Sequence, residues 1–309
     1  MLKIIDSHCH LNLEPLYSGK GLREYNASTK KNWSHFWKQA QKSGVKGLII
    51  PGTSLTSSQI AAKIARKNTN IFATIAIHPE EITLNSNPEI SSLENSNPEE
   101  SDYLPEKFLK ELVKLKEIAK LNKQIVAVGE TGLDYFHLKK NKQKNLGSTI
   151  SLQKKLFVKH IQLANQLKLP LVLHVRDVNN CYHDKKCAYK DVITLIKKYY
   201  QFTKPLIFHC ISGSRQYLKQ ILDLDAYISI AGNVTYPSAE EIREIVKMAS
   251  LDKILVETDA PYLAPQSQRG KTNQPAFIKE TVVFLQTNFA IKPEKLFVNT
   301  QQAFEIKIV

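Results

Sequence analysis

Short apolar runs recur along the whole chain, and they constrain its fold more than any other feature. Each is rich in aliphatic and β-branched side chains and is bounded by Gly, Pro or polar residues, which is typical of a strand buried on both faces. Eight such strands are predicted, at Lys3–His8, Val45–Pro51, Ile71–Ile77, Ile125–Gly129, Leu171–His174, Leu206–His209, Tyr227–Ala231 and Ile254–Glu257.

Amphipathic helical patterns lie between most of these runs. The clearest is Ser151–Leu167, and Tyr189–Tyr200, Arg215–Leu222 and Ala239–Met248 are similar. Strands that alternate with helices pair in parallel, and eight units predict an α/β fold of the (β/α)8 TIM-barrel type, because closure removes the open edges of the sheet. An open doubly wound sheet is the alternative, but no GxGxxG follows the first strand, so a dinucleotide-binding version has no support.

The 309 residues are predicted to form a single domain, since barrels of this length are routinely one unit. Two segments have the character of loop insertions. Residues 83–105 are rich in Asn, Ser, Pro and Glu and contain the pentapeptide NSNPE twice, and residues 179–190 (NNCYHDKKCAYK) interrupt the path from the fifth strand to its helix. Neither changes the strand count, and both are expected near the rim of the barrel.

Composition bears on partners and on location. The net charge of +14 favours encounters with polyanions, although a general abundance of Lys explains it equally well. Four cysteines are too few for a disulfide framework, and Cys181, His183 and Cys187 supply only three ligands where structural zinc sites have four, so a polar loop is favoured there. The chain starts without a signal-peptide pattern and has no apolar run of the ~20 residues that span a bilayer, so we expect a cytoplasmic protein without membrane contact.

Imidazole and carboxylate side chains fall at the ends of the predicted strands. These are His8, His10, Glu130, His174, His209 and Asp259. Because the carboxyl ends of barrel strands form one rim, where active sites lie, we expect the six to converge on metal ions. A lone histidine would more often be structural, but six candidate ligands at strand ends favour a metal site. The spacing of His8 and His10 places both on one face of a strand, with Cys9 turned into the barrel wall.

The remaining histidines are less informative. His78 ends the third strand, so it is expected to contact substrate or to support the ligands. His35, His137 and His160 lie in helical or loop patterns, and a solvated surface position is favoured for all three.

Several motifs are together specific for one family. They are DSHCHLN (6–12), GVKGLIIPGTS (44–54), AIHPE (76–80), VAVGETGLDY (126–135), LPLVLHVRD (169–177), PLIFHCISGS (205–214), ISIAGNVTY (228–236) and ILVETDAPYLAP (254–265). Over nearly its whole length the chain resembles the TatD family of metal-dependent deoxyribonucleases, within the amidohydrolase-like barrel superfamily. The resemblance implies hydrolysis of DNA phosphodiester bonds by an activated water, from an end of the DNA, with single-stranded DNA as the expected partner and no obligate protein partner.

The resemblance also implies roles for individual residues. His8 and His10 bind a first metal, Glu130 bridges to a second, and His174 and His209 bind the second. Asp259 binds the first metal and contacts the attacking water, so that Asp259 and Glu130 are the catalytic candidates. Arg176 and Tyr135 are expected to face the substrate.

Some alternatives stay open at this point. The mixed imidazole and carboxylate ligands suit two ions of Mg, Mn or Zn, and they do not favour one of these metals over the others. A metal-dependent ester or amide hydrolase, such as a D-aminoacyl-tRNA deacylase, would use the same site. A binding protein that has lost catalysis is disfavoured because the ligand set is complete. Nothing in the sequence fixes the polarity of cleavage, the preference for DNA over RNA, or the oligomeric state.

Overall fold

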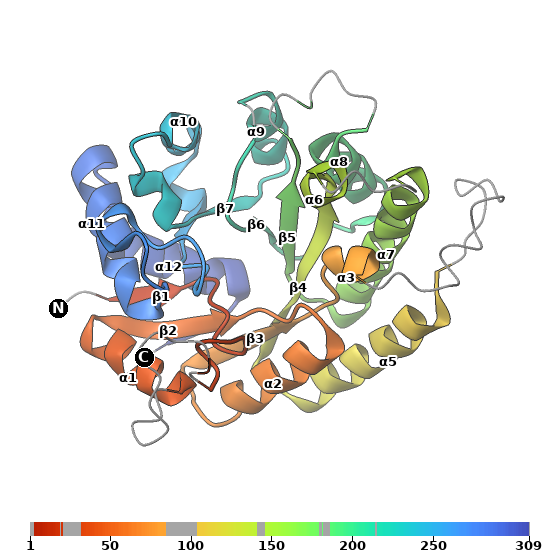
Figure 1. Cartoon of the computed structure of the whole chain (residues 1–309), viewed down its shortest axis with the longest axis horizontal. Coiled ribbons are helices and arrows are strands. Elements are labelled where there is room, and N and C mark those ends of the chain that lie inside the picture. Colours follow the sequence, from red (N-terminus) through yellow and green to blue (C-terminus); the bar gives the residue numbers. More distant parts are fainter. Residues whose placement is uncertain are drawn as a thin grey trace.

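Eight parallel strands form one sheet in which each strand pairs with the next along the chain (Figure 1). The computed structural model describes residues 3–18, 20, 32–84, 104–140, 146–178, 181, 186–213 and 215–308. Its strands are β1 (Ile4–Asp6), β2 (Val45–Ile50), β3 (Ile71–Ile75), β4 (Ile125–Asp134), β5 (Leu171–Arg176), β6 (Leu206–Phe208), β7 (Tyr227–Ile230) and β8 (Ile254–Val256).

Backbone hydrogen bonds bring the two edges of this sheet together. The N–H of Ser7 donates to the carbonyl of Val256 at 3.1 Å, and the N–H of Asp259 donates to the carbonyl of His8 at 2.9 Å. These bonds join β1 to β8 and nearly close the barrel. The predicted TIM-barrel fold is therefore confirmed.

Helices cover the outside of the sheet (Figure 1). The described α-helices are α1 (Trp33–Lys42), α2 (Leu55–Ala65), α3 (Glu80–Leu84), α5 (Glu106–Leu121), α6 (Tyr135–Lys140), α7 (Leu146–Leu167), α8 (Ala188–Tyr199), α9 (Arg215–Leu222), α10 (Glu240–Met248), α11 (Ile278–Phe289) and α12 (Pro293–Phe304). The four helices predicted from periodicity correspond to α7, α8, α9 and α10. Among the described residues no helix is long and apolar enough to cross a membrane.

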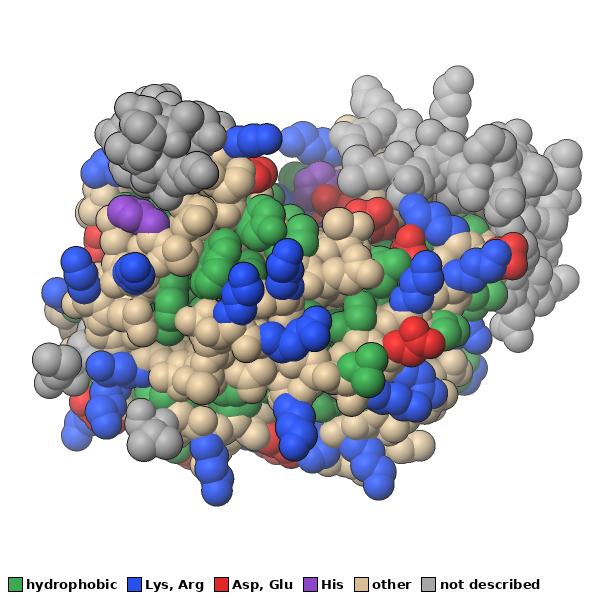
Figure 2. All heavy atoms as spheres, turned by 90° about the horizontal axis from the view of Figure 1, so that it is seen from below, with side chains coloured by type: hydrophobic (Ala, Val, Ile, Leu, Met, Phe, Trp, Pro, Cys, Tyr) green, Lys and Arg blue, Asp and Glu red, His purple; other side chains and the backbone are tan. Residues whose placement is uncertain are grey.

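Positive charge is dispersed over the face of the molecule that Figure 2 shows. Figure 2 shows Lys and Arg side chains distributed across one face, with acidic side chains between them. On this face the net charge of +14 does not gather into a single basic patch.

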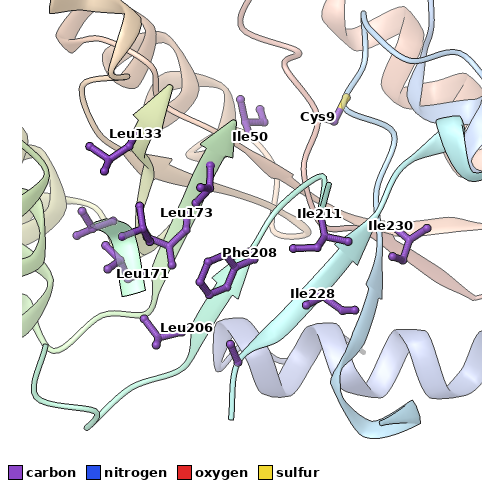
Figure 3. Close-up of a cluster of buried hydrophobic side chains, with 14 of the residues drawn as sticks. Cys9, Ile50, Leu133, Leu171, Leu173, Leu206, Phe208, Ile211, Ile228 and Ile230 are labelled. Atoms are coloured by element: carbon purple, nitrogen blue, oxygen red, sulfur yellow. The ribbon is translucent and has the colours of Figure 1, made fainter. Parts of the chain in front are cut away.

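Buried side chains divide into two clusters because successive strand residues point to opposite faces. The larger cluster joins one face of the strands to the helices, and Figure 3 shows part of it, including Leu173, Phe208 and Ile228. Cys9 belongs to this cluster, in agreement with the prediction that it points into the wall. The smaller cluster takes the alternate residues, such as Ile5 and Ile49, and joins them to the end of the chain.

The end of the chain seals this smaller cluster. Phe304, Ile306 and Ile308 pack against the alternate strand residues. A Cβ atom at Gly47 of β2 would lie 2.0 Å from the Cδ1 atom of Ile308, so a larger residue at this position would displace the Ile308 side chain. The closed end of the barrel leaves the opposite rim to carry the site.

Strand β4 differs most from its prediction. The sequence analysis ended this strand at Gly129, whereas β4 continues to Asp134. Its register against β5 shifts between Val128 and Thr131, which marks a bulge. A bulge redirects the side chains within it, and here it contains Glu130.

The predicted insertions are described only in part. Residues 85–103, 179–180 and 182–185 lie outside the described residues, so the prediction for them is untested. At the edges the prediction was too wide: residues 83–84 complete α3, Leu104 is buried, and Ala188 begins α8. Cys181 and Cys187 form a disulfide, which the sequence analysis did not predict.

A substitution in β4 tests the close packing of β4 on β5. A Cβ atom at Gly132, where φ is +143°, would lie 2.1 Å from the carbonyl oxygen of His174. We expect Gly132→Ala to lower the free energy of unfolding by ~2–4 kcal/mol, from backbone strain and overpacking together. Gly270→Ala is the matched control, because Gly270 has φ +86° but nothing within 4 Å. Denaturant titration measures both, and equal losses would contradict the packing argument.

Candidate metal centre

Glu130 lies at the centre of the group of polar side chains on the barrel rim. Its Oε2 is 3.2 Å from His8 Nε2 and 2.7 Å from His209 Nε2. Its Oε1 is 3.7 Å from His10 Nε2 and 4.0 Å from His78 Nε2. The bulge in β4 therefore places one carboxylate between histidines that follow β1, β3 and β6.

Asp259 completes the side of the site next to β1. Its Oδ1 is 3.4 Å from His10 Nε2 and 3.8 Å from His8 Nε2. Asp259 has φ +54°, in the left-handed region that non-glycine residues seldom occupy. Its backbone N–H is fixed by the bond to His8, so this unusual conformation keeps the carboxylate facing the two histidines.

His174 completes the opposite side. Its Nδ1 lies 3.2 Å from His209 Nε2, and its Nε2 lies 3.1 Å from Asp134 Oδ2. The structure thus brings all six predicted ligands together. Among the trios of described residues close enough to share an ion, three overlap in this group, namely His8–Glu130–His209, His8–His10–Asp259 and His78–Glu130–His174.

The burial of these side chains, and the polar atoms among them that lack hydrogen bonds, indicate that the site suits cations. His8, His10, Glu130 and His209 are buried. His8 Nε2 and Glu130 Oε2 have no hydrogen-bond partner of suitable geometry among the described residues. A buried carboxylate without hydrogen bonds is costly unless a cation compensates it. Imidazole nitrogens and carboxylate oxygens that converge in this way fit divalent ions.

The pKa values show how strongly these groups interact. Burial opposes charge on His209, but Glu130 and Glu257 outweigh it and raise the pKa of His209 well above the usual value. Burial also opposes charge on Glu130, but His209 and His8 hold its pKa well below the usual range. Burial and the neighbouring His209 lower the pKa of His8. The cluster behaves as one electrostatic unit and not as separate groups.

A cavity of about 590 Å³ opens over these side chains. His10, Glu130, His174, His209 and Asp259 line it, together with residues from the surrounding loops, among them Thr53, His78, Glu80, His137, Arg176, Asn233 and Tyr262. The guanidinium of Arg176 lies 4.4 Å from the centre of the Phe136 ring, a cation–π contact that holds it at the wall. Arg176 is exposed at the mouth of this cavity.

His78 and Tyr135 occupy different surroundings. The backbone N–H of Glu80 donates to His78 Nδ1 at 3.3 Å, so Nε2 is the nitrogen of His78 that faces Glu130. Burial and the neighbouring His174 lower the pKa of His78 to about 3. Tyr135 is fully buried, donates to Asp191 Oδ2 at 2.8 Å and is not among the residues that line the cavity. The prediction that Tyr135 faces substrate gains no support from this position.

The sequence analysis missed several residues around the site. Asp134 and Glu257 are buried behind His174 and His209, and nothing in a single sequence marked them beyond their place near strand ends. His137, predicted at the surface, has a side chain that is 32% exposed, but it also lines the cavity and lies 2.6 Å from Glu80 Oε1. The surface prediction was wrong for His160, which is buried and whose Nε2 accepts the N–H of Ile77 at 3.0 Å.

Known proteins resemble this chain in sequence over most of its length. The family model "TatD related DNase" matches residues 5–306. The chain is 29% identical over 301 residues to an uncharacterized metal-dependent hydrolase of Buchnera aphidicola, which covers 97% of this chain and 94% of the relative. A similar hydrolase of Mycoplasma genitalium is 31% identical over 288 residues, covering 91% of this chain and 89% of the relative.

Solved structures show the same fold. The TatD homolog YjjV of Escherichia coli has a TM-score of 0.72 at 22% identity and covers 98% of both chains. The phosphotriesterase homology protein of Escherichia coli, complexed with phosphate in its active site, has a TM-score of 0.60 at 14% identity, again over 98% of both chains.

Fold, buried ligand cluster and relatives together define a metal-dependent hydrolase built on a TIM barrel. Since the family model covers almost the entire sequence, the chain belongs to the TatD family.

Metal binding should release protons. The pKa values of His209 and His10 are raised, so without metal both imidazoles keep protons at pH values below their own pKa. Their nitrogens bind an ion only when unprotonated. Metal affinity should therefore rise with pH, by up to about tenfold per pH unit for each proton released. Calorimetric titration with Zn²⁺ or Mn²⁺ at pH 7, in buffers of different ionisation enthalpy, counts the protons. If the metal affinity does not change with pH and no protons are released, His10 and His209 do not lose protons when the metal binds, and the prediction is contradicted.

Proposed function

We propose that this protein hydrolyses DNA phosphodiester bonds, from an end of single-stranded DNA, with two divalent ions of Mg, Mn or Zn. One observation carries the proposal: a single oxygen, Glu130 Oε2, lies within 3.2 Å of both His8 Nε2 and His209 Nε2. A carboxylate in that position could be shared by two ions, and two-metal sites of this kind serve in-line displacement at phosphate esters.

The ligands divide into two sets about Glu130. His8, His10 and Asp259 would hold one ion, and His174 and His209 would hold the other, with Glu130 shared. Divalent ions bound there would lower the pKa of a water molecule and polarise the scissile ester. The number of ions, two, and their identity as Mg, Mn or Zn are both part of this proposal.

Asp259 is the best-placed group to act on the attacking water. Its carboxylate lines the cavity, and His10 and His8 hold its pKa below the usual value although burial opposes this. It is therefore ionised at neutral pH and available to orient the water and accept its proton.

Two side chains are assigned to the substrate. Arg176 stands at the cavity mouth with a guanidinium that suits the oxygens of a phosphate. His78 accepts the Glu80 N–H at Nδ1, so the proton of the neutral ring is on Nε2, which faces the ligand cluster. That N–H is a donor suited to an oxygen of the substrate. A second substrate contact from Tyr135 is not part of the proposal.

Removing the carboxylate charge of Asp259 should stop turnover without unfolding the protein. We expect Asp259→Asn to lower kcat at least ~100-fold, because an amide cannot accept the proton of the water. Glu130→Gln should also weaken metal binding, because the shared carboxylate contacts both sets of ligands. Asp252→Asn, at an exposed position paired with Lys295, is the control. Near-native turnover in Asp259→Asn would show that the water is activated elsewhere.

Product analysis separates a nuclease from a D-aminoacyl-tRNA deacylase. Labelled single-stranded DNA, duplex DNA, RNA and aminoacyl-tRNA are incubated in parallel with Mg²⁺, Mn²⁺ or Zn²⁺. We expect metal-dependent release of nucleotides from single-stranded DNA, with affinity that falls with salt by a slope of about −0.7 per neutralised phosphate.

Arg176→Ala should reduce this release while metal occupancy stays unchanged, since its proposed partner is the substrate. Amino acid released from tRNA, with DNA intact under all three metals, would replace the proposal with the deacylase.

A further inference from the structure

Two histidines of the site each lie between the ligand cluster and a buried carboxylate. His174 directs Nδ1 toward His209 Nε2 at 3.2 Å and Nε2 toward Asp134 Oδ2 at 3.1 Å. His209 directs Nε2 toward Glu130 Oε2 at 2.7 Å and Nδ1 toward Glu257 Oε1 at 3.5 Å. The two rings therefore present opposite nitrogens to the cluster, and each has a carboxylate behind the other nitrogen.

These carboxylates are costly to bury, which argues that they serve the site. Asp134 and Glu257 are both 0% exposed. Neither oxygen of Glu257 has a hydrogen-bond partner of suitable geometry, and the ion-pair partner found for it among the described residues is His209. A carboxylate in this state is stable only with positive charge nearby.

Asp134 is itself held firmly. Its Oδ1 accepts the backbone N–H of His137 at 2.9 Å, and its Oδ2 lies 2.8 Å from His137 Nδ1. Its own N–H donates to Gln153 Oε1 at 3.1 Å. Because these contacts hold the Asp134 carboxylate in place, it can orient the imidazole ring of His174 that lies against it.

Across the site the pattern is different. His10 Nδ1 is buried without a hydrogen-bond partner among the described residues. The carboxylates that approach His10 do so at Nε2, on the ligand side. His209 Nδ1 also has no hydrogen bond of suitable geometry, but Glu257 Oε1 lies 3.5 Å from it, whereas the ion pairs found for His10 among the described residues are all at Nε2.

We propose that Asp134 and Glu257 are positioning residues for the ion held by His174 and His209, an inference that rests on the two-ion function proposed above. A neutral imidazole carries one N–H. When that N–H donates to a carboxylate, the lone pair of the other nitrogen is free and correctly aimed. Asp134 fixes Nδ1 of His174 as the ligand atom, and Glu257 fixes Nε2 of His209. The ion on this side is therefore held more tightly than the ion held by His8, His10 and Asp259.

Isosteric substitutions test this with metal binding alone. Asp134→Asn keeps the acceptor for the His137 N–H but removes the charge. Glu257→Gln removes the charge beside His209 Nδ1 at nearly constant side-chain volume. In Mn²⁺ titrations followed by calorimetry, the wild type should bind two ions of unequal affinity. Each variant should weaken the tighter ion by about 10–100-fold and leave the weaker one within about threefold. Asp191→Asn is the matched control, because Asp191 binds Tyr135 and Lys154 but no histidine of the site.

The identity of the ligand nitrogen gives a second readout that a purely structural role would not change. In ¹⁵N-histidine spectra of the Zn²⁺-loaded protein, His174 should coordinate through Nδ1 and His209 through Nε2. In the variants we expect mixed coordination or loss of the coordinated signal for the ring concerned. If Glu257→Gln does not fold, Glu257→Asp should retain the assignment with reduced affinity.

Equal weakening of both ions, or unchanged affinity and nitrogen assignment in both variants, would overturn the positioning role. Failure of the proposed nuclease function would appear differently, as intact DNA in the presence of a normally loaded wild-type protein.

Discussion

The burial of the Glu130 carboxylate among imidazoles is the interaction on which the rest of the site depends. An ionised carboxylate withdrawn from water costs several kcal/mol unless opposite charge compensates it. Glu130 obtains this compensation chiefly from His209, whose pKa is raised and whose Nε2 lies 2.7 Å from Oε2, and His8 Nε2 lies 3.2 Å from the same oxygen. His10, His78 and Asp259 lie around the same carboxylate, on the wall of the cavity that Glu130 also lines.

The barrel meets this requirement through backbone geometry. Parallel strands bring residues from distant parts of the chain to one rim, and the bulge in β4 turns Glu130 toward its centre. The bond between Asp259 N–H and the carbonyl of His8 joins the two edges of the sheet at the point where ligands from β1 and β8 meet. The interactions that nearly close the fold therefore also assemble the site.

Beyond the ligands, the polar network is unevenly distributed. Carboxylates lie behind His174 and His209, whereas the outer nitrogen of His10 has no partner among the described residues. Arg176 stands on the wall of the same cavity as the ligands. A site of this form can hold its metal ions by different means and keep one wall for an anionic substrate, which agrees with the membership of the chain in a family of metal-dependent hydrolases.

Sequence alone determined the fold and the main candidate ligands, because both depend on patterns that are local along the chain. Apolar runs alternating with amphipathic helices specify a parallel barrel, and polar residues at strand ends must then meet at its rim. Thus His8, His10, Glu130, His174, His209 and Asp259 were identified before their distances were known.

Tertiary structure decided what depends on contacts between distant segments. It extended β4 through a bulge, buried Tyr135 against Asp191, and moved His137 and His160 from expected surface positions to a cavity wall and the core. It also placed a carboxylate beside one nitrogen of each ring, with Asp134 lying 40 residues from His174 and Glu257 on a different strand end from His209. No local pattern records such pairs, since a histidine ring is oriented by whatever carboxylate the completed fold places behind it.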